Sequence, residues 1–305
     1  MSEAEIVAPR AEALPREGLL ALAASVTLLS SAFPVTKVAL THGAAPLWFA
    51  LGRAGFAALT ASVLLAILRR WSVPRRADLP AVVSVATLQL ALFFALIHTA
   101  LAYVPAGRSS VLSNATVVWI APLSVLLLRE RVPARRWAAA CVGLLGTVVL
   151  IGPWSLDWHA PGVLFGHVLL LIAAFAFALG ITILRGWPPR TPMVQLLPWC
   201  FGGASVLLLP LVLASGERVG MWAPQAQLAM AYIGLIAAPF GSLCVMLAAR
   251  MLPAMVSSVG FLATPAIGLL LSVVFLGEAL TPDLVVGSCL ILGGVALAAW
   301  PGRRR

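Results

Sequence analysis

Long apolar segments follow one another along almost the whole sequence, with only short polar stretches between them. Each is close to the roughly 20 residues that a helix needs to cross a bilayer core about 30 Å thick. Hydrophobic residues make up 62% of the chain and charged residues 10%, a balance that no soluble core of this length could bury. We therefore expect an all-α membrane protein with the lipid bilayer as a partner. Ten helices are expected, over residues 18–40, 45–68, 79–102, 105–128, 133–152, 162–185, 191–214, 226–249, 253–276 and 282–300.

The basic residues lie in short clusters between these segments, and their distribution predicts an orientation. If the N-terminus is inside, 16 of the 20 basic residues fall on the inner side: Arg10, Arg16, Arg69, Arg70, Arg75, Arg76, Arg129, Arg131, Arg135, Arg136, Arg185, Arg190, Arg250 and Arg303 to Arg305. Cytoplasmic loops carry such an excess, which suits anionic lipid head groups and argues against nucleic acid as a partner. Both termini are expected in the cytoplasm, the first as a polar tail over residues 1–17.

An internal repeat divides the chain into two halves. A shift of 148 residues aligns 105–152 with 253–300 without a gap, with 15 identities in 48 positions, and places Glu130 on Glu278. The repeat contains five helices, an odd number, so the second half must enter the membrane in the opposite orientation. The arginines that flank Glu130 are absent around Glu278, as expected if the second loop faces outward. We therefore predict two inverted five-helix repeats, over 18–152 and 162–301.

Two stretches of the sequence resemble a known family. The pattern LAYVPAGRSSVLSNATVVWIAPLSVLLLRERV followed by GLLGTVVL is similar to the EamA-type repeat of the drug/metabolite transporter superfamily, as is MLPAMVSSVGFLATPAIGLLLSVVFLGEAL followed by GGVALAA. The resemblance covers essentially the whole chain as two repeats. It implies alternating-access transport of small metabolites, and the bacterial aromatic amino-acid exporters are similar in length and helix layout.

The resemblance thus leads us to expect export of a small-molecule solute, an amino acid with a neutral or aromatic side chain, across the bacterial inner membrane. The alternative is an exchanger of anionic metabolites or sugar phosphates, which needs at least two cationic groups in the cavity. A more remote alternative is an intramembrane enzyme. The sequence offers no nucleophile elbow and no metal cluster for it, and no cofactor or metal is expected.

Carriers built from inverted repeats bind their solute near the bilayer midplane, between the halves. Segment 105–128 is the richest in polar residues, with Asn114, Thr116 and Trp119 near its centre, and its repeat partner 253–276 carries Phe261 and Thr264. We expect these residues to face a solute cavity, because polar groups are costly in lipid. The alternative is local bonding and close packing, as Ser and Thr commonly show in membrane helices.

Four further candidates lie on other helices. Gln89 and His98 are nine residues apart, so an α-helix would point them to opposite faces and both could not line one wall. Tyr232 and Trp199 are further candidates for contact with the solute. The alternative for these aromatic side chains is anchoring at the membrane surface.

Two cations lie within the outer parts of the first two helices. Lys37 either takes part in binding or extends toward the membrane surface. Arg53 lies about 10 Å deep, where it either contacts a substrate carboxylate or fixes the hairpin of the first two helices. No acid lies mid-membrane, which disfavours cationic drugs and carboxylate-based proton antiport. Glu130 and Glu278 are interpreted as structural partners of helix N-termini or arginines.

Segments 133–152 and 282–300 have few polar side chains and many small ones, such as Gly143, Gly146, Gly287, Gly293 and Gly294. Small residues let two helices approach closely. This composition predicts a place at the periphery of the bundle or a homodimer contact through these two helices.

Overall fold

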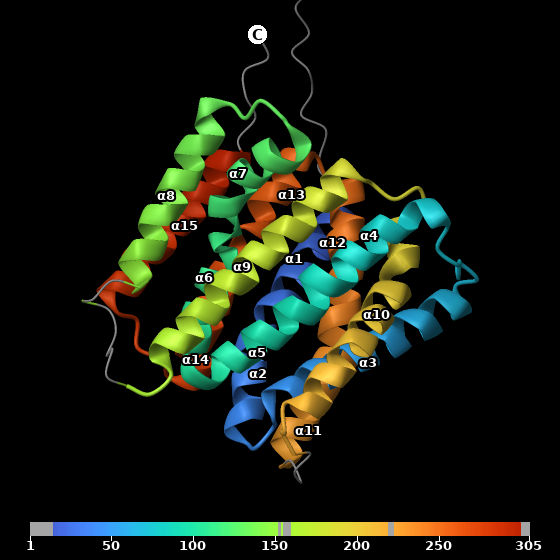
Figure 1. The fold of residues 1–305 in the computed structure, drawn as a ribbon, viewed down its shortest axis with the longest axis horizontal. Coiled ribbons are helices and arrows are strands. Elements are labelled where there is room, and N and C mark those ends of the chain that lie inside the picture. The colour runs from blue at the N-terminus through green and yellow to red at the C-terminus, as the bar shows by residue number, and fades with distance from the viewer. Residues whose placement is uncertain (1–14, 152–153, 155–159, 219–222, 300–305) are drawn as a thin grey trace, which may run out of the picture.

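The computed structural model describes residues 15–151, 154, 160–218 and 223–299 of the 305-residue chain (Figure 1). Within these ranges the chain is helical and contains no strand. Nine helices there are long and apolar enough to cross a membrane. Their bounds are Arg16–Thr41, Pro46–Ile67, Arg76–Tyr103, Ala106–Leu128, Ala134–Ile151, Val163–Gly186, Met193–Ala214, Pro224–Met251 and Pro282–Ala299. The chain is therefore a multi-pass membrane protein.

Several of these crossings consist of more than one helical segment. The elements are α1 (Arg16–Ser30), α2 (Ala32–Thr41), α3 (Pro46–Ile67), η1 (Arg76–Asp78), α4 (Leu79–Ser84), η2 (Val85–Leu92), α5 (Phe93–Tyr103), α6 (Ala106–Leu112), η3 (Ser113–Ala115), α7 (Thr116–Leu128), α8 (Ala134–Ile151), α9 (Val163–Gly186), α10 (Met193–Ala214), α11 (Pro224–Ala231), η4 (Tyr232–Ala237), α12 (Ala238–Met251), α13 (Ala254–Phe261), α14 (Ala263–Leu276) and α15 (Pro282–Ala299).

Prolines lie close to three of the interruptions. The expected helix 253–276 is divided at Leu262 into α13 and α14, because Pro265 has no N–H to donate to the carbonyl four residues earlier. Pro34 stands in the same relation to the break at Ser31, between α1 and α2. Pro239 follows the π-helix η4. These breaks all fall in the middle of the bundle, where irregular backbone is tolerated only beside protein or a cavity.

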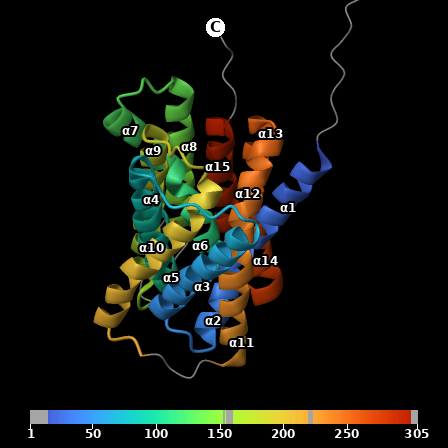
Figure 2. The ribbon, with the colours of Figure 1, turned by 90° about the vertical axis from the view of Figure 1, so that its right-hand side faces the viewer.

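The helices form one bundle in which the start of α1 and the end of α15 lie at the same end (Figures 1 and 2). In Figure 1, α8 and α15 lie together on one side, while α3 and α10 lie on the opposite side. The turn from α7 to α8 is at the end that holds the start of α1 and the end of α15, and the turn from α14 to α15 is at the other.

The two acids expected to be structural have that role. The carboxylate of Glu278 accepts hydrogen bonds from the backbone N–H groups of Ala106 (2.6 Å) and Gly107 (2.8 Å), at the N-terminus of α6. The carboxylate of Glu130 pairs with the guanidinium of Arg185 at 2.7 Å. Both contacts confirm the interpretation, and both join one half of the chain to the other.

A third acid, Asp78, ties the start of α4 to the loop before α10. Its carboxylate accepts hydrogen bonds from the N–H groups of Arg75, Arg190 and Thr191 and from the Thr191 hydroxyl, at 2.7–3.1 Å. The sequence analysis did not single out this residue. It is fully buried, so these four donors are what offset the cost of removing its charge from water.

The glycines of α8 and α15 bring the backbones of these two helices together. A Cβ added to Gly146 would lie 2.8 Å from the carbonyl oxygen of Gly287 and 2.8 Å from the nitrogen of Ile291. A Cβ added to Gly294 would lie 2.8 Å from the carbonyl oxygen of Ala139. The small residues therefore serve packing within the chain.

We predict that Gly146→Leu destabilises the bundle by about 1–3 kcal/mol, because the new side chain must displace backbone atoms of α15. Thermal unfolding in detergent, followed by tryptophan fluorescence, measures the effect. Gly293→Leu is the matched control, since nothing lies within 4 Å of a Cβ at that position. Equal melting temperatures for the two variants would contradict the packing described.

Candidate functional site

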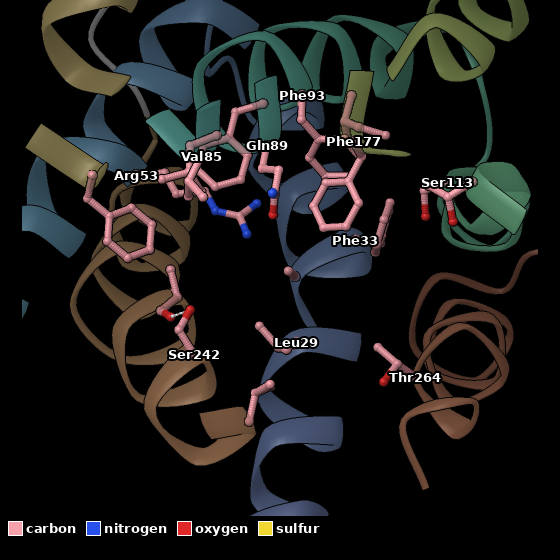
Figure 3. Close-up of a pocket in the computed structure, with 18 of the residues that line it drawn as sticks. Leu29, Phe33, Arg53, Val85, Gln89, Phe93, Ser113, Phe177, Ser242 and Thr264 are labelled. Atoms are coloured by element: carbon pink, nitrogen blue, oxygen red, sulfur yellow. Dashed lines mark hydrogen bonds between the residues drawn. The ribbon is translucent and has the colours of Figure 1, made fainter. Parts of the chain in front are cut away.

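A cavity of about 440 Å³ lies between helices of both halves (Figure 3). Its described lining residues come from α1, α2, α3, η2, α5, η3, α7, α9, α10, α12 and α14. Neither α8 nor α15 contributes to this lining. Helices from before residue 152 and helices from after residue 162 therefore line one space.

The walls are largely apolar and include five phenylalanines: Phe33, Phe93, Phe94, Phe177 and Phe201. Phe93 and Phe177 pack against each other with ring centroids 4.9 Å apart. Such walls suit a solute with an apolar or aromatic body, oriented by a few polar groups.

Polar atoms without a hydrogen-bond partner are concentrated here. Seven buried side-chain nitrogen or oxygen atoms lack a partner in the described part of the chain, and four belong to residues that line the cavity. They are Thr36 Oγ1, Arg53 Nε, Gln89 Nε2 and His98 Nδ1. Buried polar atoms are normally satisfied, so this grouping points to a polar ligand.

Arg53 of α3 is the cationic group of the cavity. Its Nη1 donates to Nε2 of His98 at 3.3 Å, and its guanidinium carbon lies 4.1 Å from the ring centroid of Phe94. Both partners belong to α5. The described contacts of Arg53 therefore join α3 to α5 and are not made to α1 or α2.

The same contact indicates which ring nitrogen of His98 carries the proton. Arginine can only donate hydrogen bonds, so Nε2 of His98 must accept, and its proton is then on Nδ1. The ring is fully buried and stacks on Phe94, with centroids 5.8 Å apart. Its Nδ1–H is therefore a donor without a partner.

Gln89 and His98 both line the cavity, although an α-helical spacing of nine residues points them to opposite faces. The reason is the π-helix η2, which contains Gln89. A π-helical turn holds more residues than an α-helical one, so one extra residue rotates the rest of the helix by about 100°. Figure 3 shows the ends of Gln89 and Arg53 directed toward the same space. The side chain of Gln89 packs over Gly180 of α9, which leaves no room for a Cβ there.

Asn114, Thr116 and Thr264 also line the cavity. The Asn114 amide nitrogen donates to the carbonyl of Ser110 at 3.0 Å, so its carbonyl oxygen is the group that a solute can use. Figure 3 shows Ser113 and Thr264 on the side of the cavity opposite Arg53. The two repeat-related segments thus lie across the cavity from the cation.

Trp119 and Phe261 do not belong to the described lining. Trp119 stands edge-on to Phe175, with centroids 5.2 Å apart. The 3₁₀-helix η3 turns about 20° more per residue than an α-helix and so rotates Trp119 away from the face expected from α-helical spacing. Phe261 precedes the break at Leu262 and packs in a separate apolar cluster with Ala21.

The other three candidates have structural partners elsewhere. Lys37 donates to the backbone carbonyls of Leu101 (2.6 Å) and Val104 (3.1 Å). The Tyr232 hydroxyl bonds to that of Ser31 at 2.8 Å. The Trp199 indole donates to the carbonyl of Ser72 at 2.9 Å and packs against Trp71. None of the three lines the cavity in the described structure.

Sequence analysis missed several lining residues, including Thr36 and Phe94. Thr36 and Phe94 lie in apolar segments without a motif around them, so only their position in the fold reveals them. Thr36 is one residue before Lys37, and the charge of its neighbour was the stronger signal. In Figure 3, Ser242 projects into the cavity from α12.

Comparison with known proteins identifies the family. The model of the EamA-like transporter family matches residues 16–152 and again residues 164–300. The chain belongs to the EamA-like transporter family. It is therefore a membrane transporter.

Two curated relatives span most of this EamA-like transporter. The uncharacterized transporter YdfC of Bacillus subtilis (strain 168) is 24% identical over 271 residues, which cover 88% of this chain and 87% of that protein. The probable terminal-alkyne amino-acid exporter of Streptantibioticus cattleyicolor is 28% identical over 304 residues, covering 93% and 97%. A crystal structure with 19% identity and a TM-score of 0.65 covers 94% of this chain and 99% of its own, which shows the fold alone.

We predict that a cysteine at Ser242 reacts readily with a small charged methanethiosulfonate reagent, because this side chain faces the cavity. Ala248→Cys on the same helix is the control, since Ala248 is fully buried in an apolar cluster. Both are made after Cys141, Cys200, Cys244 and Cys289 have been replaced by serine. Slow reaction at position 242, equal to that at 248, would argue against an accessible cavity.

Proposed function

We propose that this EamA-like transporter exports amino acids with apolar or aromatic side chains across the bacterial inner membrane. The observation that carries the proposal is the cavity itself, with phenylalanine walls and a group of polar atoms that lack partners. The carboxylate of an amino acid matches Arg53, its amino group matches the carbonyl oxygen of Asn114, and its side chain matches the walls. The probable amino-acid exporter among the relatives supports the same class of solute.

We infer that the solute crosses by alternating access between two inverted five-helix repeats over 18–152 and 162–301, with α13 and α14 together as the ninth of ten helices. The geometry at repeat-related positions supports this. Arg129 and Gly277 both end a helix in the left-handed region, with φ of 52° and 67°. The next residues, Glu130 and Glu278, each donate their N–H to the carbonyl of a serine six residues earlier.

Each of the two repeat-related glutamates binds the other half of the chain. The shift of 148 relates Glu130 to Glu278. Arg185 pairs with Glu130, and Glu278 accepts hydrogen bonds from the N–H groups of Ala106 and Gly107. The two glutamates follow α7 and α14, whose ends lie at opposite ends of the bundle (Figure 1). We propose that these contacts hold the two ends of the solute path closed in turn.

The orientation belongs to the same proposal. The end of the bundle with the start of α1 and the end of α15 also holds the α7–α8 turn and its arginines. The excess of basic residues at that end supports a cytoplasmic location for both termini. Glu130 and Arg185 would then close the solute path at its cytoplasmic end.

We predict opposite effects of Glu130→Gln and Glu278→Gln on access to the cavity. Each change weakens the contacts that close its own end of the solute path. For the Glu130–Arg185 pair the loss is about 1 kcal/mol or less, because both side chains are about 40% exposed. The measurement is the labelling of Ser242→Cys by an impermeant reagent, in inside-out and right-side-out vesicles. A shift in the same direction for both variants would contradict the inverted arrangement.

An exchanger of sugar phosphates fits the site less well. That chemistry needs several cationic groups in the cavity, and the sequence offers Lys37, Arg53 and Arg108 near it. Lys37 is engaged by backbone carbonyls, and Arg108 pairs with Asp283 at 2.8 Å. Arg53 is the one described cation that lines the cavity. An enzymatic function is further disfavoured by the family, whose members are transporters.

A homodimer through α8 and α15 would use their outer faces, because the glycine faces already pack against each other within the chain. Leu144, Leu145 and Val148 are exposed on α8 and would contact either lipid or a second copy. Cross-linking of Leu145→Cys in native membranes tests this arrangement, and a strictly monomeric product would oppose it.

The central test is transport in proteoliposomes with a panel of labelled solutes. We predict uptake of phenylalanine, tryptophan and leucine above protein-free vesicles, and none of glucose 6-phosphate or glycerol 3-phosphate. Asn114→Ala should reduce the uptake, because the amino group loses its acceptor. Trp199→Phe is the control for a residue outside the cavity. Movement of the phosphates without any amino acid would overturn the proposal.

A further inference from the structure

Among the fully buried polar atoms of the cavity that lack a partner, hydrogen-bond donors outnumber acceptors. Among the cavity atoms without a partner, Arg53 Nε, Gln89 Nε2 and His98 Nδ1 are all donors. The fourth, the hydroxyl of Thr36, can donate or accept. A ligand that satisfies this set must bring acceptors to the Arg53 end, and an ionised carboxylate brings two oxygens that only accept.

Negative charge is absent from the same cavity. None of its described lining residues is Asp or Glu. Asp78, Glu130, Glu278 and Asp283 are bound to backbone N–H groups or arginines at helix ends. Glu217 accepts a hydrogen bond from the N–H of Leu47. The charge of Arg53 is thus offset by its contacts with Phe94 and His98 alone, and a solute anion would be its first ionic partner.

This imbalance has a consequence for the two charged groups of an amino acid. The carboxylate meets a cation and further donors, whereas the ammonium meets only neutral acceptors such as the carbonyl oxygen of Asn114. A charged partner strengthens a hydrogen bond about twofold over a neutral one. The carboxylate should therefore contribute most of the binding free energy that comes from polar contacts.

We propose that the cavity recognises its solute through the carboxylate and does not require the amino group, so that apolar and aromatic monocarboxylates are bound and transported alongside amino acids. This proposal refines the proposed function. Its statement about transport rests on that function, whereas its statement about binding does not. Decarboxylated amines, which carry a positive charge and no acceptor, are excluded by the same arrangement.

A second cavity supports an anionic solute. It has a volume of about 340 Å³ and is lined by Arg70 and Arg250, both exposed, together with Gln195. Met246, a flexible side chain, lines both cavities, so the two adjoin at this residue. The two arginines of this second cavity would attract a carboxylate and repel an amine.

Binding to the purified protein in detergent tests the proposal without relying on transport. The probes are phenylalanine, 3-phenylpropionate, N-acetylphenylalanine and phenethylamine, which share the aromatic ring and differ in the charged groups. We expect the three carboxylates to raise the melting temperature and to bind with dissociation constants within about tenfold of one another, and phenethylamine to do neither.

The variants are Arg53→Gln and Arg131→Gln. Arg131 is exposed in the α7–α8 turn, so its loss removes one positive charge without touching the cavity. We expect Arg53→Gln to weaken binding of all three carboxylates by about tenfold or more, as for loss of a hydrogen bond to a charged group, and Arg131→Gln to leave it unchanged. If Arg53→Gln is misfolded by size-exclusion chromatography, the comparison of the four probes on the unaltered protein still decides.

The two proposals fail in different ways. Binding of phenylalanine without 3-phenylpropionate or N-acetylphenylalanine overturns the inference, while uptake of phenylalanine in proteoliposomes keeps the proposed function. Binding of all three carboxylates, with uptake of 3-phenylpropionate and N-acetylphenylalanine but of no amino acid, supports the inference and removes the proposed function. Binding of phenethylamine as tight as that of phenylalanine, or no binding of any probe, overturns the inference.

Discussion

A polar group inside a bilayer must find a partner within the protein or face an aqueous cavity, and this constraint organises the structure. Most membrane-embedded polar groups here have such partners: Lys37 binds two carbonyls, Arg108 binds Asp283, and Glu278 binds two N–H groups. Arg53 is different, because the described structure provides it with a histidine and an aromatic face but no anion. A buried cation without an anion is costly in stability, which favours a functional reason for its retention.

Much of the fold could be predicted from the sequence because the signals are large. Runs of about 20 apolar residues are unambiguous, and the expected helix over 191–214 is close to the observed Met193–Ala214. The 148-residue shift anticipated the two family matches, and it placed Glu130 and Glu278 at equivalent turns. The divisions at Ser31 and Leu262 coincide with prolines, which are visible in the sequence.

The site was predicted less completely, because a change of helix type alters which residues share a face. The π-helix over Val85–Leu92 brings Gln89 and His98 to one cavity, and the 3₁₀-helix over Ser113–Ala115 turns Trp119 away from it. Neither segment has a sequence signature comparable to proline. Six of the eleven candidates line the cavity, namely Arg53, Gln89, His98, Asn114, Thr116 and Thr264, and the other five serve packing or bond to neighbours.

The same irregular helices explain how a small set of polar residues can be both buried and available. In a regular α-helix, Ser and Thr hydroxyls bond back to the preceding turn, as Ser242 does to Ala238. In the described structure, Arg53 Nε, Gln89 Nε2 and His98 Nδ1 make no such bond to their own helices. Donors of this kind stay available while the surrounding phenylalanines keep the cavity apolar. A carboxylate attached to an apolar group would bind the donors and contact the phenylalanine walls at the same time. The positive charge of Arg53 and the apolar walls therefore favour the same solute.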